Sequence, residues 1–380
     1  MCPDAAAPPC VGDGGDHGLL SADPAVNPDW ADATAVFVAY CDGGSFAGAL
    51  DAPLVVEGVP VFLRGSAVLT ALFADILETM RAGGGASEVL LKGASAGGQA
   101  LLIHANALAA TLRRAAGAPR VSLLIDAGLF LDTPSMDGPN TIRPFTEAWV
   151  ALHNATGSLP PACTSPRPPA AAPAAPAPAA GGLSPQLCAL SQTLLAAVDP
   201  SLPLFIAQFA ADSAQLSWVM GLRCKHGLPM SLPPAAPPPA GSTLNACNAR
   251  KVAYLNAFRA RMLDALAPVL RSGSPLHGAW VAECGLHIVG NSDGGWTALR
   301  VQNQTQRETV RAWYARAAAA AAGAAGRGSG VSGGVPVARS GGSSLSGAPL
   351  LLPRVVDGEW GTNPTCTLYA PPAVPTVPSP

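Results

Sequence analysis

Charged side chains are scarce in this sequence: they make up 12% of its 380 residues, and the formal net charge is −2. A protein that binds nucleic acid by electrostatics needs a stripe or patch of Lys and Arg. No such stretch occurs, so we expect no nucleic-acid partner. The sequence also lacks an unbroken run of about 18 apolar residues, which is close to the minimum length of a membrane-spanning helix. Its positive mean hydropathy comes largely from alanine, and we expect no membrane span.

The cysteines include no Cys-x-x-Cys pair, the spacing typical of zinc sites. The nine are scattered along the chain, at Cys2, Cys10, Cys41, Cys163, Cys188, Cys224, Cys247, Cys284 and Cys366. Scattered cysteines favour disulfides and therefore the secretory pathway, and two Asn-x-Thr sequons, at 154–156 and 303–305, agree with this. The first residues, however, show neither the basic nor the apolar region of a signal peptide. Either a signal peptide is missing from this sequence or the protein stays inside the cell.

Low-complexity segments divide the chain. The start, residues 1–18, is mostly Pro, Gly, Ala and Asp without periodicity, which predicts a disordered lead-in. Segments near 164–182 and 233–241 are rich in Pro and Ala, and the one near 323–346 is rich in Gly and Ser. The hydrophobic content of 49% is enough for a sizeable core. We therefore expect a single domain over 19–380 that carries these disordered insertions.

Short apolar runs alternate with helical patterns over most of this domain. Apolar runs typical of buried strands occupy 35–40, 89–91, 120–125, 203–209 and 280–282, and a hairpin pattern occupies 53–63. Helical patterns occupy 66–80, the segment after Ser95 up to about 114, 186–198, 248–267 and 309–322. This succession predicts an α/β fold with a mostly parallel sheet covered by helices on both faces.

The segment Gly93-Ala94-Ser95-Ala96-Gly97 lies between one of these strands and its helix. Strand, sharp turn and helix form the context that a Gly-x-Ser-x-Gly nucleophile elbow requires. There the Ser95 hydroxyl is exposed as a nucleophile, and the Ala96 N–H at the helix N-terminus faces a developing oxyanion. The alternative is a glycine-rich helix entry without chemistry.

A serine nucleophile needs a base, and the base needs an orienting acid. Among the six histidines, His287 follows a late strand, where the order Ser, acid, His of α/β-hydrolases places the base. A loop histidine with only a structural role is the alternative. Asp126 and Asp212 each follow a strand, and the pattern alone does not separate them. A Gly-rich turn at Gly43 and Gly44 follows the strand predicted at 35–40, where open α/β sheets place their sites. A simple tight turn without a functional role is the alternative.

Several motifs together resemble the pectin acetylesterase family, which also includes the Notum carboxylesterases that remove an acyl group from Wnt proteins. They occur in order between about Leu19 and Cys366. They are Tyr40-Cys41-Asp42-Gly43-Gly44-Ser45-Phe46, the elbow with His104 and Asn106, Asp126-Ala127-Gly128-Leu129-Phe130-Leu131-Asp132, Leu204-Phe205-Ile206 leading to Asp212-Ser213, and Cys284-Gly285-Leu286-His287.

The resemblance implies an α/β-hydrolase-like fold and a serine carboxylesterase that removes O-acetyl groups from a cell-wall or extracellular polysaccharide. It implies a monomer that is secreted or bound to the cell wall and needs no metal or cofactor. It also selects the acid and leaves Asp126 as a structural residue beneath the site. The implied catalytic residues are Ser95, Asp212 and His287, and the implied oxyanion or substrate contacts are Ala96, Gly43 and Gly44.

The sequence departs from the family pattern in three places. The family carries a strand with a Glu-Gly-Gly-Gly-Trp-Cys type of loop before the Tyr-Cys-Asp-Gly motif, and none precedes Leu19 here. Ile288 and Ala94 stand where the family usually has cysteines. We expect that a signal peptide and a first strand are missing from this sequence. Two other functions stay open: a Notum-like protein lipid deacylase, and a non-catalytic or truncated hydrolase-fold protein.

Overall fold

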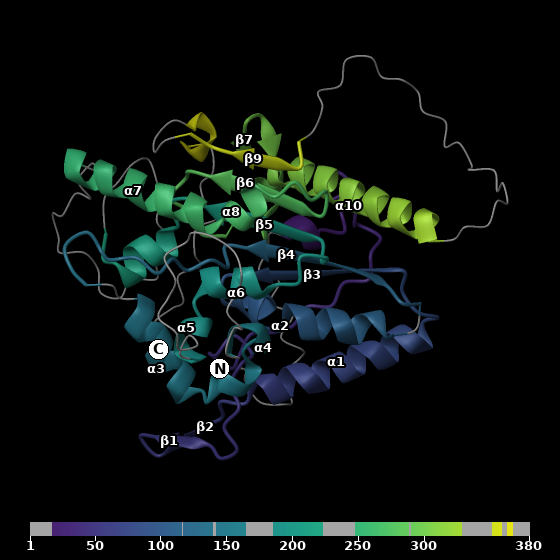
Figure 1. The fold of residues 1–380 in the computed structure, drawn as a ribbon, viewed down its shortest axis with the longest axis horizontal. Coiled ribbons are helices and arrows are strands. Elements are labelled where there is room, and N and C mark those ends of the chain that lie inside the picture. Colours follow the sequence, from purple (N-terminus) through teal and green to yellow (C-terminus); the bar gives the residue numbers. More distant parts are fainter. Residues whose placement is uncertain are drawn as a thin grey trace, which may run out of the picture.

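A five-stranded parallel sheet forms the centre of the protein (Figure 1). A computed structural model describes residues 17–115, 117–139, 142–164, 185–222, 248–288, 290–328, 352–358 and 363–367. The strands lie in the order β3 (Glu88–Ala94), β4 (Arg120–Asp126), β5 (Leu204–Phe209), β6 (His277–Ala282) and β9 (Arg354–Val356). The predicted parallel sheet is therefore confirmed.

Side chains alternate between the two faces of this sheet, as a strand requires. One face is lined by Leu123, Ile125, Leu204, Ile206, Ala279 and Val281, and the other by Leu124, Phe205, Ala207, Phe209, Trp280 and Ala282. The first face packs against α1 (Gly65–Ala82), α2 (Ala96–Arg113), α6 (Ser191–Ala197), α7 (Ala249–Ala265) and α8 (Ala267–Leu270). The second packs against α9 (Asp293–Thr297) and α10 (Gln306–Gly328), so helices cover both faces as predicted (Figure 1).

Local sequence signals account for the buried face of α1 and for the start of α7. In α1, Leu69 and Phe73 are buried four residues apart, on the side of the helix that faces the core. In α7, Asn248 caps the first turn, because its side chain accepts the backbone N–H of Lys251 at 3.0 Å. Both helices lie where the apolar periodicity predicts them.

The segment 35–40 corrects one prediction. It is not a strand but an irregular, exposed stretch in which the Phe37 side chain is 72% exposed. Among the described residues no strand pairs with it, and an apolar run becomes a buried strand only when a neighbour satisfies its backbone. The predicted hairpin nearby is confirmed as β1 (Leu54–Val56) and β2 (Val59–Val61), which project from the molecule (Figure 1).

Other boundaries differ in detail from the predictions. The helix expected at 186–198 is broken at Leu190 into α5 (Pro185–Cys188) and α6. Strand β6 starts three residues earlier than expected, at His277. Two short helices, α3 (Ile142–Leu152) and α4 (Pro161–Thr164), were not predicted.

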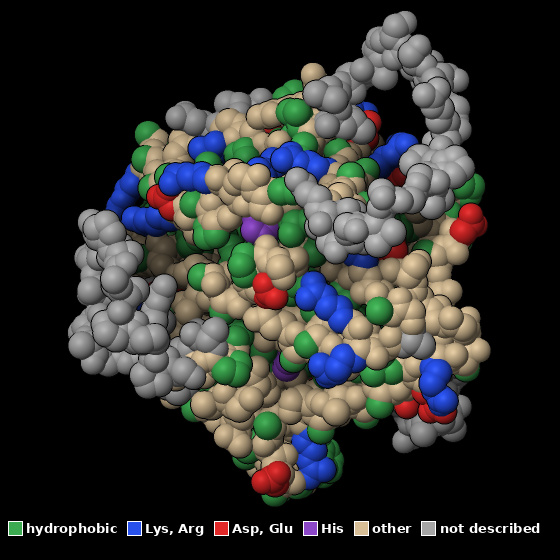
Figure 2. Space-filling view, turned by 45° about the vertical axis from the view of Figure 1, so that its right-hand side comes forward, with side chains coloured by type: hydrophobic (Ala, Val, Ile, Leu, Met, Phe, Trp, Pro, Cys, Tyr) green, Lys and Arg blue, Asp and Glu red, His purple; other side chains and the backbone are tan. Residues whose placement is uncertain are grey.

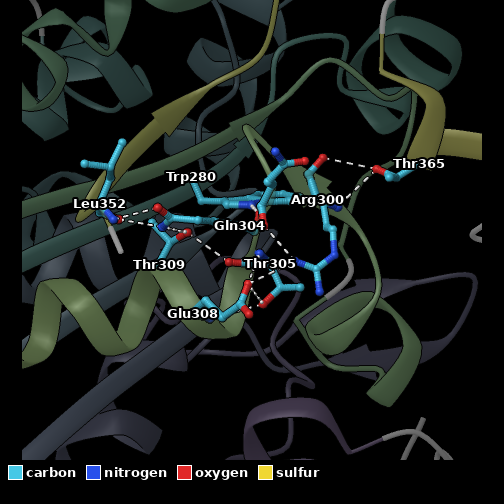
Figure 3. Close-up of polar contacts among 9 residues, drawn as sticks. Trp280, Arg300, Gln304, Thr305, Glu308, Thr309, Leu352 and Thr365 are labelled. Carbon is cyan, nitrogen blue, oxygen red and sulfur yellow. Dashed lines mark hydrogen bonds and ion pairs between the residues drawn. The ribbon is translucent and has the colours of Figure 1, made fainter. Parts of the chain in front are cut away.

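A small hairpin fastens the C-terminal part of the chain to the sheet (Figure 3). It consists of β7 (Arg300–Val301) and β8 (Gln304–Thr305). The Gln304 amide donates to Leu352 O at 2.8 Å, and the Arg300 N–H donates to Thr365 Oγ1 at 3.1 Å. A disulfide joins Cys284 to Cys366, so at least these two of the scattered cysteines form a disulfide, as predicted.

Most of the low-complexity sequence lies outside the described residues: positions 1–16 of the predicted lead-in, and the insertions near 164–182 and 233–241 except Thr164. Helix α10 extends to Gly328 and so includes the beginning of the third insertion, whereas 329–346 again lies outside.

Within the part of the chain that the structure describes, no helix has the length and apolar character of a membrane span. Lys and Arg side chains are dispersed over the face drawn in Figure 2.

Candidate active site

Ser95 occupies a strained turn between β3 and α2. Its backbone has φ 53° and ψ −120°, a conformation that non-glycine residues seldom adopt. The turn is tight because a Cβ on Gly93 would lie 2.1 Å from Gly97 O, and one on Gly98 would lie 2.8 Å from Gly128 Cα. The glycines therefore let the strand, the helix and the neighbouring β4 approach closely, which is the geometry expected of a nucleophile elbow.

Ser95, His287 and Asp212 form a continuous chain of short contacts. The Ser95 Oγ atom lies 2.7 Å from His287 Nε2, and His287 Nδ1 lies 2.7 Å from Asp212 Oδ2. When the imidazole donates from Nδ1 to the carboxylate, Nε2 is left to accept the serine proton. The structure thus brings together the three residues that the resemblance selects.

The carboxylate of Asp212 is fully buried and held from two sides. Its Oδ1 accepts the backbone N–H of Gln215 at 2.9 Å, and Gln208 Nε2 lies 3.5 Å from Oδ2. Burial acts to lower the pKa of His287, but Asp212, assisted by Asp126, outweighs it, and the pKa is raised from its ordinary value.

The topology explains why these residues meet. Ser95 follows β3, Asp212 follows β5 and His287 follows β6, and the carboxyl ends of parallel strands share one edge of the sheet. Asp126 ends β4 at the same edge, but its Oδ2 pairs with Lys92 Nζ at 3.7 Å. The position of a carboxylate after a strand was thus not enough to tell the two acids apart.

The loop with Gly43 and Gly44 lies beside the first turn of α2. Ser45 Oγ is 3.3 Å from the Oε1 atom of Gln99, and the Gln99 N–H donates to Ser95 O at 3.0 Å. Gly43 has φ +68°, and a Cβ on Gly44 would lie 2.3 Å from His153 Nδ1, so both positions favour glycine. The roles of these glycines and of the Ala96 N–H toward an oxyanion stay predictions.

Sequence reasoning missed three side chains around the site. Gln99 links the glycine loop to the turn between α5 and α6 by donating to Ala189 O at 3.4 Å. The Phe130 ring centroid lies 6.2 Å from that of His287. Gln208 reaches Asp212 from within β5, where one polar residue in an otherwise apolar strand was a usable signal.

The other described histidines take no part in this chain of contacts. His104 Nε2 lies 3.0 Å from Phe46 O. His153 is buried behind Gly44, and His277 Nδ1 lies 2.9 Å from Ser272 Oγ. No cluster of metal-ligating side chains occurs among the described residues.

Comparison with known sequences gives one family over most of the chain. The profile of the Pectinacetylesterase family matches residues 14–366. Pectin acetylesterase 7 of Arabidopsis thaliana is 29% identical over 321 residues, which cover 80% of this chain and 71% of the relative. The palmitoleoyl-protein carboxylesterase NOTUM of Mus musculus is 33% identical over 117 residues, which cover 30% of this chain and 22% of the relative.

Solved structures show the same fold. The crystal structure of the Wnt deacylase Notum from Drosophila superposes with a TM-score of 0.59 at 20% sequence identity, and covers 79% of this chain and 74% of that one. The architecture is therefore that of the α/β-hydrolase-like Notum fold, as predicted.

Proposed function

Since this chain belongs to the Pectinacetylesterase family and is a carboxylic ester hydrolase, we propose that it removes O-acetyl groups from a cell-wall or extracellular polysaccharide. The names of its relatives, pectin acetylesterases 7 and 11 of Arabidopsis thaliana, point to acetylated pectin as the substrate class. The proposal includes secretion, because such a polymer lies outside the cell. We also propose that residues 19–380 act as one domain.

The proposed reaction is acyl transfer through Ser95. Its Oγ attacks the acetyl carbon while its proton passes to His287 Nε2, and Asp212 holds the imidazole by Nδ1. The tetrahedral oxyanion would accept hydrogen bonds from the N–H groups of Ala96 and of the loop that contains Gly43 and Gly44. Collapse releases the sugar hydroxyl with the proton from His287, and a water molecule then hydrolyses the acetyl-enzyme with the same histidine as base.

The observation that carries this proposal is the pair of 2.7 Å contacts that joins Ser95, His287 and Asp212. Ser95 lies in a strained turn and contacts a half-buried histidine that is itself paired with the buried Asp212. The geometry matches that of a nucleophile with its base and orienting acid.

The test is acetate release from acetylated pectin by the full chain and by Ser95→Ala. We expect the variant to lose at least about 10⁴-fold in kcat/KM, because the nucleophile is gone. Ser122→Ala is the matched control: this serine is buried on β4 and should retain the wild-type rate. Retained turnover in Ser95→Ala would overturn the mechanism.

A Notum-like activity on long acyl groups is the second candidate, supported by the partial identity to NOTUM. A series of p-nitrophenyl esters from acetyl to palmitoleoyl separates the two. We expect kcat/KM to be highest for acetyl and to fall as the chain lengthens, whereas an optimum at a long acyl chain would favour the lipid deacylase.

A further inference from the structure

A second group of buried polar side chains lies beneath the loop that carries His287. Asp126 ends β4 and is 1% exposed, Gln306 begins α10 and is 0% exposed, and the side chain of Lys92 on β3 is 13% exposed. These residues come from three different elements, yet all three contact Gly290 or Asn291. The catalytic chain of Ser95, His287 and Asp212 uses none of them.

The loop backbone rests directly on this group. A Cβ on Gly290 would lie 2.5 Å from Asp126 Oδ2 and 2.9 Å from Gln306 Oε1, so only glycine fits there. Lys92 Nζ contacts Asn291 Oδ1 and lies 3.7 Å from Asp126 Oδ2. Asp126, Gln306 and Lys92 thus contact the chain at Gly290 and Asn291, three and four positions after His287 in the sequence.

The same group is coupled to His287 by charge. Burial raises the pKa of Asp126 and lowers that of Lys92, and the charge of each group opposes the shift of the other. The Asp126 charge in turn adds to Asp212 in raising the pKa of His287. The groups that face the imidazole are thus the carboxylates of Asp212 and Asp126, the Ser95 hydroxyl and the Phe130 ring, and Lys92 faces Asp126.

We propose that Asp126 is a positioning residue for His287, kept ionised by Lys92, and that it stabilises the imidazolium formed during acyl transfer. This inference rests on the proposed function, because it assigns a role within the same site. Asp126 touches no reacting atom. It acts by supporting the loop at Gly290 and by adding a second negative charge to the surroundings of His287.

The test compares Asp126→Asn with a matched control on the same two strands. Glu88 and Arg120 are the first residues of β3 and β4, at the end of the strands away from the site, and they form an ion pair with a 2.7 Å contact. Glu88→Gln therefore removes a carboxylate far from the site. In Asp126→Asn we expect the His287 pKa, measured by NMR titration, to fall by about one unit, a tenfold change in proton affinity. The acid limb of the pH profile of kcat/KM on p-nitrophenyl acetate should move to lower pH by the same amount. The plateau value of kcat/KM should be about tenfold lower.

Lys92→Met gives the sharper result. Without the ammonium a buried Asp126 carboxylate takes up a proton, so this variant should also lower the His287 pKa, although it removes a charge of the opposite sign. Glu88→Gln should leave both the pKa and the profile unchanged. If Asp126→Asn alone does not fold, the double variant Lys92→Met with Asp126→Asn leaves no charge unpaired and should show the same lowered pKa.

Two results would overturn the inference. An unmoved His287 pKa in a folded Asp126→Asn protein would reduce Asp126 to a structural residue, and a raised pKa in Lys92→Met would show that Lys92 does not keep Asp126 ionised. The NMR titration needs no turnover. If the variants show the predicted His287 pKa shifts but the wild-type protein does not hydrolyse esters, the proposed function is contradicted and this inference still stands.

Discussion

His287 is the residue at which opposing influences on proton affinity meet. Burial disfavours the charged imidazolium, whereas the nearby carboxylates favour it, and their effect is the larger. A base with a raised pKa accepts the serine proton readily, but it must be neutral before it can do so. The operating pH of the site is thus set by charges on neighbouring strands.

We predict a pH dependence with a defined sign. Because neutral His287 is the active form and its pKa lies above the ordinary value of about 6.5, kcat/KM should rise with pH through a midpoint above that value. The protonated form also contributes to stability below the unfolded-state pKa, and this contribution is lost as pH rises through the folded-state pKa. Initial rates on p-nitrophenyl acetate measure this midpoint. A series from about pH 5 to about pH 9 covers the titration range of histidine. A midpoint below 6.5 would contradict the assignment.

At this scale the sequence identified some residues and not others. The motif around Ser95 predicts its own turn, because only small residues fit the close approach of strand and helix there. The acid had no such signature: Asp126 and Asp212 both stand at the carboxyl ends of buried strands, and their partners in the folded protein, Lys92 and His287, distinguish them. The pattern also contained no sign of Lys92, because a lysine in an edge strand normally points to solvent.

At the scale of elements, the junction of β3 and α2 depends on which glycine is replaced. Gly93→Ala should destabilise the protein by several kcal/mol, because the new Cβ would lie 2.1 Å from Gly97 O and the backbone must shift. Activity should fall with it, since the same backbone aims Ser95. Thermal unfolding and ester hydrolysis measure the two effects.

Gly97→Ala is the matched comparison within the same motif. A Cβ there meets nothing within 4 Å, and alanine is favoured over glycine in a helix by about 1 kcal/mol. We expect an unchanged or slightly higher Tm. Equal destabilisation by both substitutions would mean that the close approach at Gly93 is not what fixes the turn.

The elements that sequence predicted well are those with local signals. Strand β5 is apolar except for Gln208 and α7 begins at a capping Asn248, so both have a clear local signal in the sequence. The segment 35–40 has the same apolar character as β5, yet a strand exists only where a partner strand lies. Strand β9 gave no signal, because three residues beyond a low-complexity segment pair with β6 only in the folded protein.

For the molecule as a whole, the disulfide between Cys284 and Cys366 joins the end of the sheet to the C-terminal segment. Its removal by Cys366→Ser should lower the free energy of unfolding by about 2–4 kcal/mol. Activity should fall as well, because Cys284 lies three residues before His287. Chemical denaturation and kcat/KM of the variant provide the check, and unchanged values for both would show that the hairpin contacts of Arg300 and Gln304 suffice.

This bond also ties the protein to the redox state of its compartment. Where both cysteines are thiols, the C-terminal segment keeps its hydrogen bonds to Arg300 but loses its covalent link to the segment before His287. The share of stability and activity that the disulfide contributes is then present only after thiol oxidation.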